Sequence, residues 1–382
     1  MYQIIAEERG ISSDELQGTI QNDLLKEYIS RGTYIYPPKQ SLRLTTDIFE
    51  YCAKELPKWN TISVSGYHMA EAGANPVQEI AFTFANAIAY LDCAKERGLS
   101  IEDVASRMSF FFVSRTTLLE EVAKFRAARQ LWAQIMKDRF GVTSERAMHL
   151  RFHTQTAGVQ LTAQQPELNL VRVALQALAA VLGGTQSLHT NSFDEALGLP
   201  TEKAARLALR TQQVIANESD VAATVDALAG SAVIESMTTE IAVAARELIA
   251  KIDQMGGAVA GIEAGFQKGE IEKSAYRISQ EIESGNRVVV GVNAFVEEAS
   301  PYLPLEINPE IAKEQSAKLA KLREGRDQSE VTKALAALGV AAKGEANLLY
   351  PMKVALLANA TLGEISDALR GEWGSYRATE IW

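Results

Sequence analysis

Short apolar segments alternate with longer amphipathic segments over the first 230 residues of the chain. Five segments are predicted as strands: Thr61–Tyr67, Met108–Val113, Leu150–Thr154, Gln186–Thr190 and, more weakly, Gly18–Gln21. Apolar positions at three- and four-residue spacing predict helices over Pro76–Arg97, Leu118–Phe140 and Gln165–Val181. Strands that alternate with helices at this rhythm favour an α/β fold, with a parallel sheet and helical crossovers.

The number of predicted strands is smaller than a closed (β/α)8 barrel of the TIM type requires, which is eight. The sheet is therefore open, or the barrel is incomplete and this chain carries its C-terminal strands. The first segment, Ile4–Arg9, is predicted as a helix, and no clear strand precedes Gly18. Strands that are missing would then belong before the start of this chain.

The pattern changes near residue 238 and becomes mainly helical. Helices are predicted over Thr239–Gln254 and Ile271–Ser284, a short strand or extended piece over Arg287–Phe295, a long charged helix over Pro309–Ala342 and at least one more helix over Ala346–Leu369. Pro301, Pro304 and Pro309 predict a linker before the long helix. We therefore expect a barrel portion at residues 1–235 and a helical region at residues 236–382.

Composition and charge narrow the possible partners. The net charge of −10 opposes nonspecific binding to nucleic acid or to an anionic membrane. Cys52 and Cys93 lie in apolar runs and are expected to be buried, reduced thiols, and no zinc-type ligand spacing predicts a metal site. No apolar stretch reaches about 18 residues, and Glu7, Glu8 and Arg9 do not fit a signal peptide. We expect a cytoplasmic protein without membrane or nucleic-acid partners.

Polar residues cluster where predicted strands end, which is where parallel α/β folds place their sites. His68 and Glu71 follow the strand Thr61–Tyr67 directly. His68 could donate a hydrogen bond to a carbonyl or carry a proton, or it could be a core histidine bonded to backbone. Glu71 could equally be a solvated residue that favours a helix start. Arg31 could bind a carboxylate through two hydrogen bonds, or it could lie on the surface.

Two further segments carry more polar groups than a packing strand needs. Alternation sends Arg151, His153 and Gln155 to one face of a predicted internal strand, where burial without partners is costly. Either a polar lumen that holds a ligand or an internal hydrogen-bond network would satisfy them. The segment Gly183–Glu195 is equally rich in hydrogen-bonding side chains.

These clusters resemble the large subunits of methylmalonyl-CoA mutase and related cobalamin-dependent acyl-CoA mutases. The matching runs are GTIQNDLLKEYISRGTYIYPP, ISVSGYHMAEAGA, FRAARQLWA, LRFHTQTAGVQLT and GGTQSLHTNSFDEALGLP. The resemblance continues through ESGNRVVVGVN to ATLGEISDALRGEWG and covers nearly the whole chain.

The resemblance implies a barrel that encloses the acyl group, with coenzyme A along its axis. His68 would bond the thioester carbonyl, Tyr67 would lie beside it near the corrin, and Arg31 would pair with the substrate's free carboxylate. The residues implied in substrate or coenzyme A binding are Gln21, Arg107, Ser109, Arg151, Gln155, Gln186 and Ser187. Those implied in contacts with the adenosyl group are Glu71, Asn191 and Glu195. The implied cofactor is adenosylcobalamin, which supplies the radical that abstracts a substrate hydrogen.

Arg31 bears on the substrate class, because relatives that act on isobutyryl-type substrates are expected to have glutamine there. An arginine favours a dicarboxylic acyl-CoA, either methylmalonyl-CoA, which interconverts with succinyl-CoA, or ethylmalonyl-CoA. The chain departs from the family pattern at Asp226–Ala232, where DPLGGSY is common, and at Val113–Thr117, which is usually rich in asparagine.

The resemblance also implies parts that this chain does not contain. The family's first barrel strands with a catalytic tyrosine, and its cobalamin domain with a D-x-H-x-x-G histidine, have no counterpart here. We therefore expect an enzyme component that needs a cobalamin-binding small subunit, which would hold most of the cofactor, and a polypeptide that supplies the N-terminal strands. The alternative is a non-catalytic or truncated mutase fragment that only binds partner subunits. An unrelated barrel lyase fits these motifs poorly.

Overall fold

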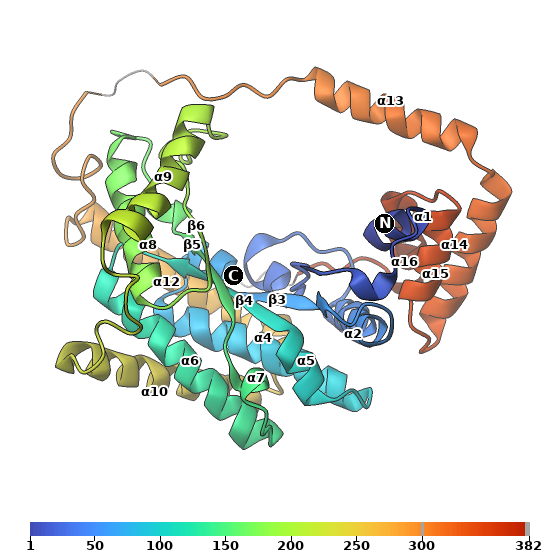
Figure 1. The fold of residues 1–382 in the computed structure, drawn as a ribbon, viewed down its shortest axis with the longest axis horizontal. Coiled ribbons are helices and arrows are strands. Elements are labelled where there is room, and N and C mark those ends of the chain that lie inside the picture. The colour runs from blue at the N-terminus through green and yellow to red at the C-terminus, as the bar shows by residue number, and fades with distance from the viewer. Residues whose placement is uncertain (299–301, 379–382) are drawn as a thin grey trace.

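The computed structural model describes residues 1–298 and 302–378, and its centre is a parallel sheet (Figure 1). Its strands run side by side in chain order: β3 (Ile62–Ser65), β4 (Met108–Ser114), β5 (Phe152–Thr156) and β6 (Ser187–His189). Every neighbouring pair is parallel, which confirms the predicted arrangement of sequence-adjacent strands.

A second parallel sheet has two short strands and involves the N-terminal part of the chain. Strand β1 (Gly18–Thr19) pairs with β2 (Trp59–Asn60), which ends two residues before β3 begins. The weakly predicted strand at Gly18 is therefore present, although it is two residues long. The described residues form a helix-rich α/β structure with parallel sheets, and closure into a (β/α)8 barrel remains a prediction.

Helices cover one face of the four-stranded sheet. The predicted helices are confirmed as α4 (Pro76–Glu96), α6 (Leu118–Phe140) and α8 (Leu168–Leu182). Helix α4 begins at a capping box, in which Asn75 and Gln78 exchange side-chain and backbone hydrogen bonds. Helix α6 ends at Gly141, whose φ of 67° is the left-handed conformation that glycine adopts readily.

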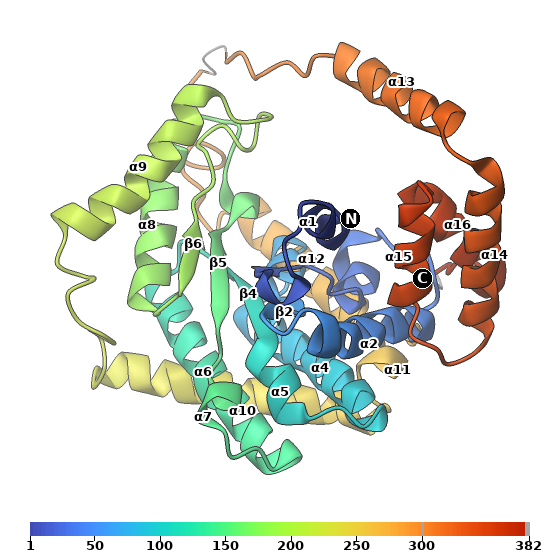
Figure 2. The same ribbon diagram turned by 45° about the vertical axis from the view of Figure 1, so that its right-hand side comes forward.

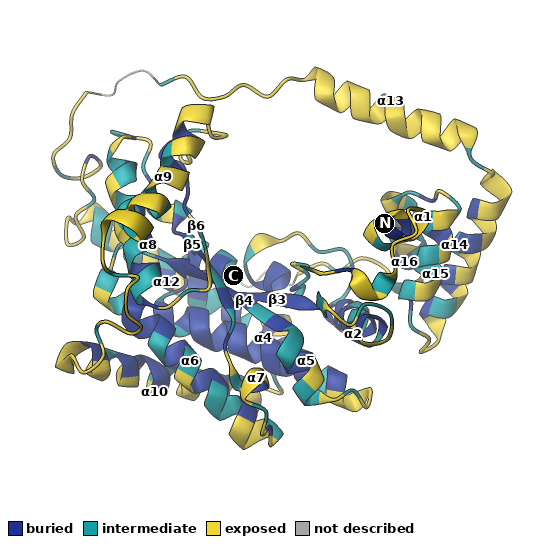
Figure 3. Ribbon diagram, in the orientation of Figure 1, coloured by how far each residue is buried: buried dark blue, intermediate teal, exposed yellow. Residues whose placement is uncertain are grey.

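The side chains of β4 alternate between the two faces of the sheet. Phe110 and Phe112 point toward the helices, where Phe84 of α4 lies 5.7 and 6.4 Å from their ring centres. Phe111, between them on β4, points to the other face, as strand alternation requires. Figure 3 shows α4 almost entirely buried behind the sheet. We call the side that carries Phe111 the inner face.

The helical segment after residue 230 packs behind the same layer. Helix α10 (Ala232–Gln254) crosses α4 and α6, and its buried isoleucines join the core of the sheet (Figures 1 and 2). Helices α11 (Ala258–Glu263) and α12 (Phe266–Glu283) follow. The helices predicted over Thr239–Gln254 and Ile271–Ser284 are thus confirmed, each starting several residues earlier than expected.

Two predictions about the last third of the chain are wrong. The segment Arg287–Phe295 is not a strand of a sheet but a turn, because the Asn293 side chain accepts from the Val289 N–H and donates to the Arg287 carbonyl. The long helix predicted over Pro309–Ala342 is two helices, α13 (Glu310–Gly325) and α14 (Gln328–Lys343).

The break between α13 and α14 has a local cause. Asp327 is in an extended conformation, and its carboxylate caps α14 by accepting from the Ser329 and Glu330 N–H groups. The neighbouring Arg326 forms a bidentate salt bridge with Glu364, in which both Nη atoms donate to the carboxylate. Helix α13 has no buried residue and spans from the linker to the C-terminal helices (Figures 2 and 3). Of the linker prolines, Pro304 and Pro309 are described, and Pro301 lies outside the described residues.

A second apolar core holds the C-terminal helices together. Helices α14, α15 (Leu349–Leu357) and α16 (Leu362–Trp373) pack around Leu338, Leu348 and Leu369, and Tyr36 joins them. The further helix predicted over Ala346–Leu369 is therefore present as a pair. The remaining helices are α1 (Tyr2–Glu8), α2 (Pro38–Glu55), α3 (Tyr67–Glu71), α5 (Ile101–Arg107), α7 (Glu145–Met148) and α9 (Glu202–Glu218), with short 3-10 turns at Ser13–Glu15 and Gly158–Gln160 and a π-helical turn at Glu27–Arg31.

Both cysteines are free thiols on helices, and the predicted burial is confirmed in full for Cys52 but only in part for Cys93. Cys52 is buried on α2, and Cys93 is half-buried on α4. Burial raises the pKa of Cys52 to about 12 and the pKa of Cys93 to about 11. Across the described ranges, no helix has the length and apolar character that crossing a membrane requires.

Candidate functional site

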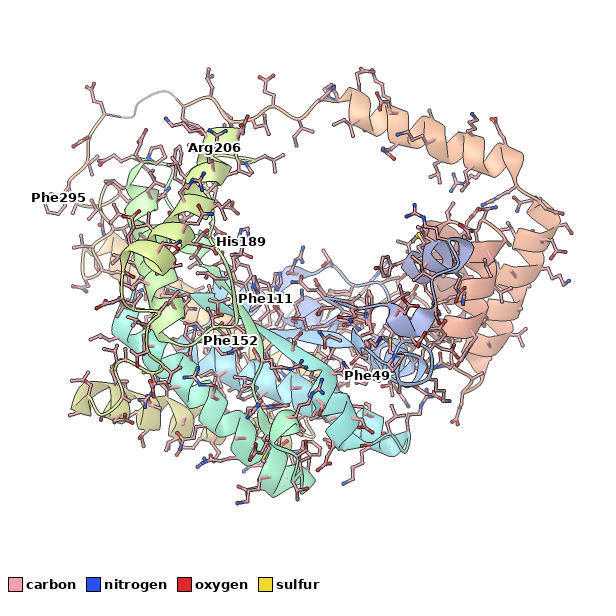
Figure 4. The ribbon with its side chains drawn as sticks, in the orientation of Figure 1. Phe49, Phe111, Phe152, His189, Arg206 and Phe295 are labelled. Atoms are coloured by element: carbon pink, nitrogen blue, oxygen red, sulfur yellow. The ribbon has the colours of Figure 1, made fainter. Side chains whose placement is uncertain are left out.

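The carboxyl ends of β3, β4 and β5 bring aromatic and polar side chains together on the inner face. Helix α3 begins directly after β3, and the Tyr67 ring stacks on Phe111 of β4 with 4.7 Å between ring centres. His68 lies edge-on to Phe111 at 5.7 Å. Figure 4 shows Phe111 and His189 on the inner side of the sheet, whereas Phe152 points toward the helices.

The side chains of Glu71, Gln155 and Asn191 lie together next to Tyr67, and Gln155 and Asn191 are hydrogen-bonded to each other. Gln155 Nε2 donates to Asn191 Oδ1 at 2.8 Å, and the Asn191 side chain in turn donates to the Thr156 carbonyl at 3.0 Å. Glu71 Oε2 accepts from the Val159 N–H at 2.8 Å. The sequence placed these residues in three separate segments, and the fold brings them into one cluster.

Glu71 carries a perturbed carboxyl group. Burial raises its pKa to about 7, against the smaller opposing effect of the Val159 hydrogen bond. Its second oxygen, Oε1, is buried and has no hydrogen-bond partner within the described parts of the chain. Burial, reinforced by the nearby Glu71 charge, also holds the pKa of Tyr67 above its ordinary value. The cluster therefore combines a carboxyl that can be protonated near neutral pH with a neutral phenol.

Gly158 closes this cluster from the side of β5. A Cβ atom at this position would lie 2.9 Å from Glu71 Oε2 and 3.2 Å from Asn191 Nδ2. A side chain here would force the ends of Glu71 or Asn191 to shift, so glycine allows the close approach of the backbone to both.

His68 is held as a neutral imidazole. Burial lowers its pKa to about 4, and the positive charges of Lys26 and Arg31 act in the same direction, against the smaller effect of Glu27. Its Nδ1 lies 2.8 Å from the hydroxyl of Ser65. A neutral imidazole can donate one hydrogen bond without changing its charge.

Arg31 lies near His68, at the end of the π-helical turn Glu27–Arg31. Its side chain is 49% exposed, and Nη1 is 3.8 Å from Glu27, which also contacts Lys26 at 2.9 Å. The guanidinium therefore lies at the surface near His68, and its ionic contact among the described residues is the long one to Glu27. Gln21, in the loop after β1, is exposed.

A second group of predicted residues lies at the opposite, amino ends of the strands. Arg151 donates to the carbonyls of Ser106 and Met108 at 2.6 and 2.8 Å, and Ser109 donates to the Ile62 carbonyl at 3.1 Å. Arg107 ends α5 and lines a cavity of about 440 Å³. The fold thus separates these residues from the cluster around Glu71, along the length of the strands.

The remaining predicted residues lie on β6 and after it. Gln186 joins β6 to β5, because its Oε1 accepts from the Phe152 N–H at 2.7 Å. The Ser187 hydroxyl is 2.6 Å from His153 Nδ1 on the inner face. Glu195 is exposed and lines a smaller pocket of about 230 Å³ that also includes His189.

Sequence reasoning missed two residues that support His68. Asp23 is fully buried, and its Oδ2 accepts from the Ser65 N–H at 2.8 Å. Ser65 stood inside a matching run without an assigned role, three positions before His68. Asp23 lies 42 residues earlier in the chain, so no local pattern could connect it to Ser65. Within residues 1–298 and 302–378, no group of three or more His, Cys, Asp or Glu could hold a metal ion.

Comparison with known proteins gives consistent matches. A family model described as methylmalonyl-CoA mutase matches residues 1–375. Methylmalonyl-CoA mutase of Escherichia coli (strain K12) is 49% identical over 378 residues, which cover 98% of this chain and 53% of that protein. The 2-hydroxyisobutanoyl-CoA mutase large subunit of Aquincola tertiaricarbonis is 45% identical over 386 residues, 100% of this chain and 68% of that protein. Mitochondrial methylmalonyl-CoA mutase of Homo sapiens is 44% identical over 381 residues, 99% of this chain and 51% of that protein. The chain thus spans about half the length of the two methylmalonyl-CoA mutases.

Proposed function

The chain belongs to the methylmalonyl-CoA mutase family, and we propose that it forms the acyl-CoA-binding component of an adenosylcobalamin-dependent mutase. In this proposal, the complete enzyme interconverts methylmalonyl-CoA and succinyl-CoA. The alternative substrate is ethylmalonyl-CoA, with the same type of carbon-skeleton rearrangement. Residues 1–235 would carry the acyl-CoA-binding barrel portion, and residues 236–382 the helical region. The observation that carries the proposal is the cluster of Tyr67, Glu71, Gln155 and Asn191 beside a neutral His68 on the inner face.

The residues present fit the adenosyl part of the cofactor. The buried Glu71 Oε1 has no partner among the described residues and could accept a hydrogen bond from a ribose hydroxyl. Gly158 leaves the space beside it free of a side chain. Glu71 and Asn191 would hold this group, with Glu195 at the rim, and adenosylcobalamin when bound would supply the radical chemistry.

The chain's own residues would bind and orient the acyl-CoA. His68, neutral at pH 7, would donate a hydrogen bond to the thioester carbonyl, where negative charge grows during rearrangement. Arg31 would bind the free carboxylate of a dicarboxylic substrate. Arg107, Ser109 and Arg151, at the amino ends of the strands, would contact coenzyme A. Gln186 and Ser187 would lie near the acyl-CoA pocket, with Gln21 at its edge.

Partner subunits are part of this proposal. One relative is named as a large subunit, which supports a cobalamin-binding small subunit as partner. The same relative acts, by its name, on 2-hydroxyisobutanoyl-CoA, so substrate choice differs within the family.

The test is a mutase assay on the purified chain with adenosylcobalamin and methylmalonyl-CoA, with and without candidate partner subunits. We expect turnover only in the reconstituted complex, and its loss in His68→Ala. His149→Ala is the matched control, because His149 is exposed at the end of α7, before β5 begins. Partner binding without turnover in any combination would instead support a non-catalytic fragment.

A further inference from the structure

The imidazole of His68 is held by a single side-chain contact. Its Nδ1 lies 2.8 Å from Ser65 Oγ, and this is the one hydrogen bond that the described residues provide to the ring. Ser65 is the last residue of β3 and is 3% exposed. The rings of Tyr67 and Phe111 both meet the imidazole edge-on, at 5.3 and 5.7 Å, which restricts its orientation.

The direction of this hydrogen bond follows from the burial of Ser65. A hydroxyl carries one proton and needs an acceptor for it, and in the described structure Ser65 Oγ has no hydrogen-bond partner other than His68 Nδ1. If Nδ1 held a proton and donated it, the buried hydroxyl proton would have no acceptor, which is costly. The serine therefore donates, Nδ1 accepts, and the proton of the neutral ring is on Nε2.

A long-range anchor fixes Ser65 in this position. The Ser65 N–H donates to Asp23 Oδ2 at 2.8 Å, and Tyr90 donates its hydroxyl to Asp23 Oδ1 at 2.7 Å. Tyr90 belongs to α4 and is fully buried, as is Asp23. The strand end that carries the hydroxyl is thus tied to the helix layer behind the sheet.

Burial, more than the nearby charges, keeps the His68 ring neutral, so the position of its one proton matters. Lys26 and Arg31 oppose a charge on the ring, and Glu27 favours it more weakly. A neutral imidazole exists as two tautomers, and the partner of one nitrogen decides which nitrogen donates.

We propose that Ser65 is a positioning residue that sets the tautomer of His68, so that Nε2–H is the hydrogen-bond donor to the acyl-CoA carbonyl. This rests on the proposed function only for the identity of the acceptor. The tautomer itself is a property of the chain without substrate.

The experiment is ¹⁵N NMR of the full chain with labelled histidine at pH 7. The chain has four histidines, and His68→Gln identifies the His68 signals by removing them. We expect the wild type to show an unprotonated Nδ1 and a protonated Nε2. In Ser65→Ala the loss of one hydrogen bond should shift the tautomer ratio by about threefold to tenfold, moving both nitrogens toward averaged shifts. Ser65→Cys, with a weaker donor, should give an intermediate ratio.

Ser63→Ala is the matched control, because Ser63 is buried two residues earlier on the same strand and should leave the tautomer unchanged. A protonated Nδ1 in the wild type, or an unchanged tautomer in Ser65→Ala, would overturn the proposal. In an active reconstituted enzyme, Ser65→Ala should lower kcat more than it changes KM. If no combination of subunits is active, the proposed function fails while the NMR result still decides the role of Ser65.

Discussion

Replacing Glu71 by glutamine should stabilise the folded chain at alkaline pH and leave it nearly unchanged at acidic pH. Burial raises the pKa of this carboxyl from 4.5 to about 7. The folded state therefore keeps a proton that the unfolded chain releases between these two values. Folded chains that bind more protons than unfolded ones lose stability as the pH rises, so the wild type weakens from about pH 4.5 to about pH 7.

The size of the effect follows from the same change in pKa. Each pKa unit corresponds to about 1.36 kcal/mol, and the partial exposure of Glu71 reduces the total, so we expect about 2–3 kcal/mol. Glutamine resembles the protonated carboxyl in shape and charge and can still accept from the Val159 N–H. Above the folded pKa, Glu71→Gln should therefore be more stable than the wild type by this amount.

The assay is urea unfolding of both proteins at pH 5 and pH 8.5, followed by the fluorescence of the four tryptophans. At each pH, the free energy of unfolding of the wild type is subtracted from that of Glu71→Gln. The prediction concerns how much this difference grows from pH 5 to pH 8.5. Glu8→Gln, on the exposed end of α1, is the matched control and should show no such change. A Glu71→Gln difference of equal size at both pH values would refute the reasoning.

Three further predictions concern substrate choice, stability and thiol chemistry. In a reconstituted active complex, Arg31→Gln should lower kcat/KM for methylmalonyl-CoA about tenfold to a hundredfold, because a charge-assisted pair is lost, and should affect isobutyryl-CoA little. Lys124→Met should destabilise the chain by about 3–5 kcal/mol, measured by urea unfolding, because it removes the buried counter-charge of Glu79 and leaves the buried Glu121 with the longer contact to Arg115 at 3.9 Å. Cys52 and Cys93 should react slowly with a thiol reagent at pH 8 and rapidly in denaturant, because burial raises both pKa values.

Each of these three predictions can be contradicted by a specific result. Equal losses for both substrates in Arg31→Gln would make the residue structural rather than a carboxylate ligand. Arg206→Ala removes an exposed ion pair with Glu202 and should cost about 0.5 kcal/mol or less. If Lys124→Met cost as little stability as Arg206→Ala, the buried contacts of Lys124 with Glu79 and Glu121 would not be important for stability. Fast modification of the native thiols would show that the helices around them open readily.

The sequence by itself determined the local elements and their order. Alternation and helical spacing report which side of an element is buried, so the strands near residues 61, 108, 150 and 186 and the helices between them could be predicted. Parallel pairing followed because each connection contains a helix. The pattern could not locate the break at Asp327, because the residues on both sides continue a helical spacing and only the cap interrupts it.

Only the tertiary structure decided which side chains meet and what their chemistry is. His68, Glu71 and Asn191 were recognised as candidates from their runs, but Asp23, which anchors Ser65 from 42 residues away, was not. The pKa of Glu71 depends on burial beneath segments that are distant in the chain, as does the neutral state of His68. The physical reason is that periodicity records the burial of one element, whereas hydrogen bonds and desolvation at a site depend on the distances between elements, and packing alone sets those distances.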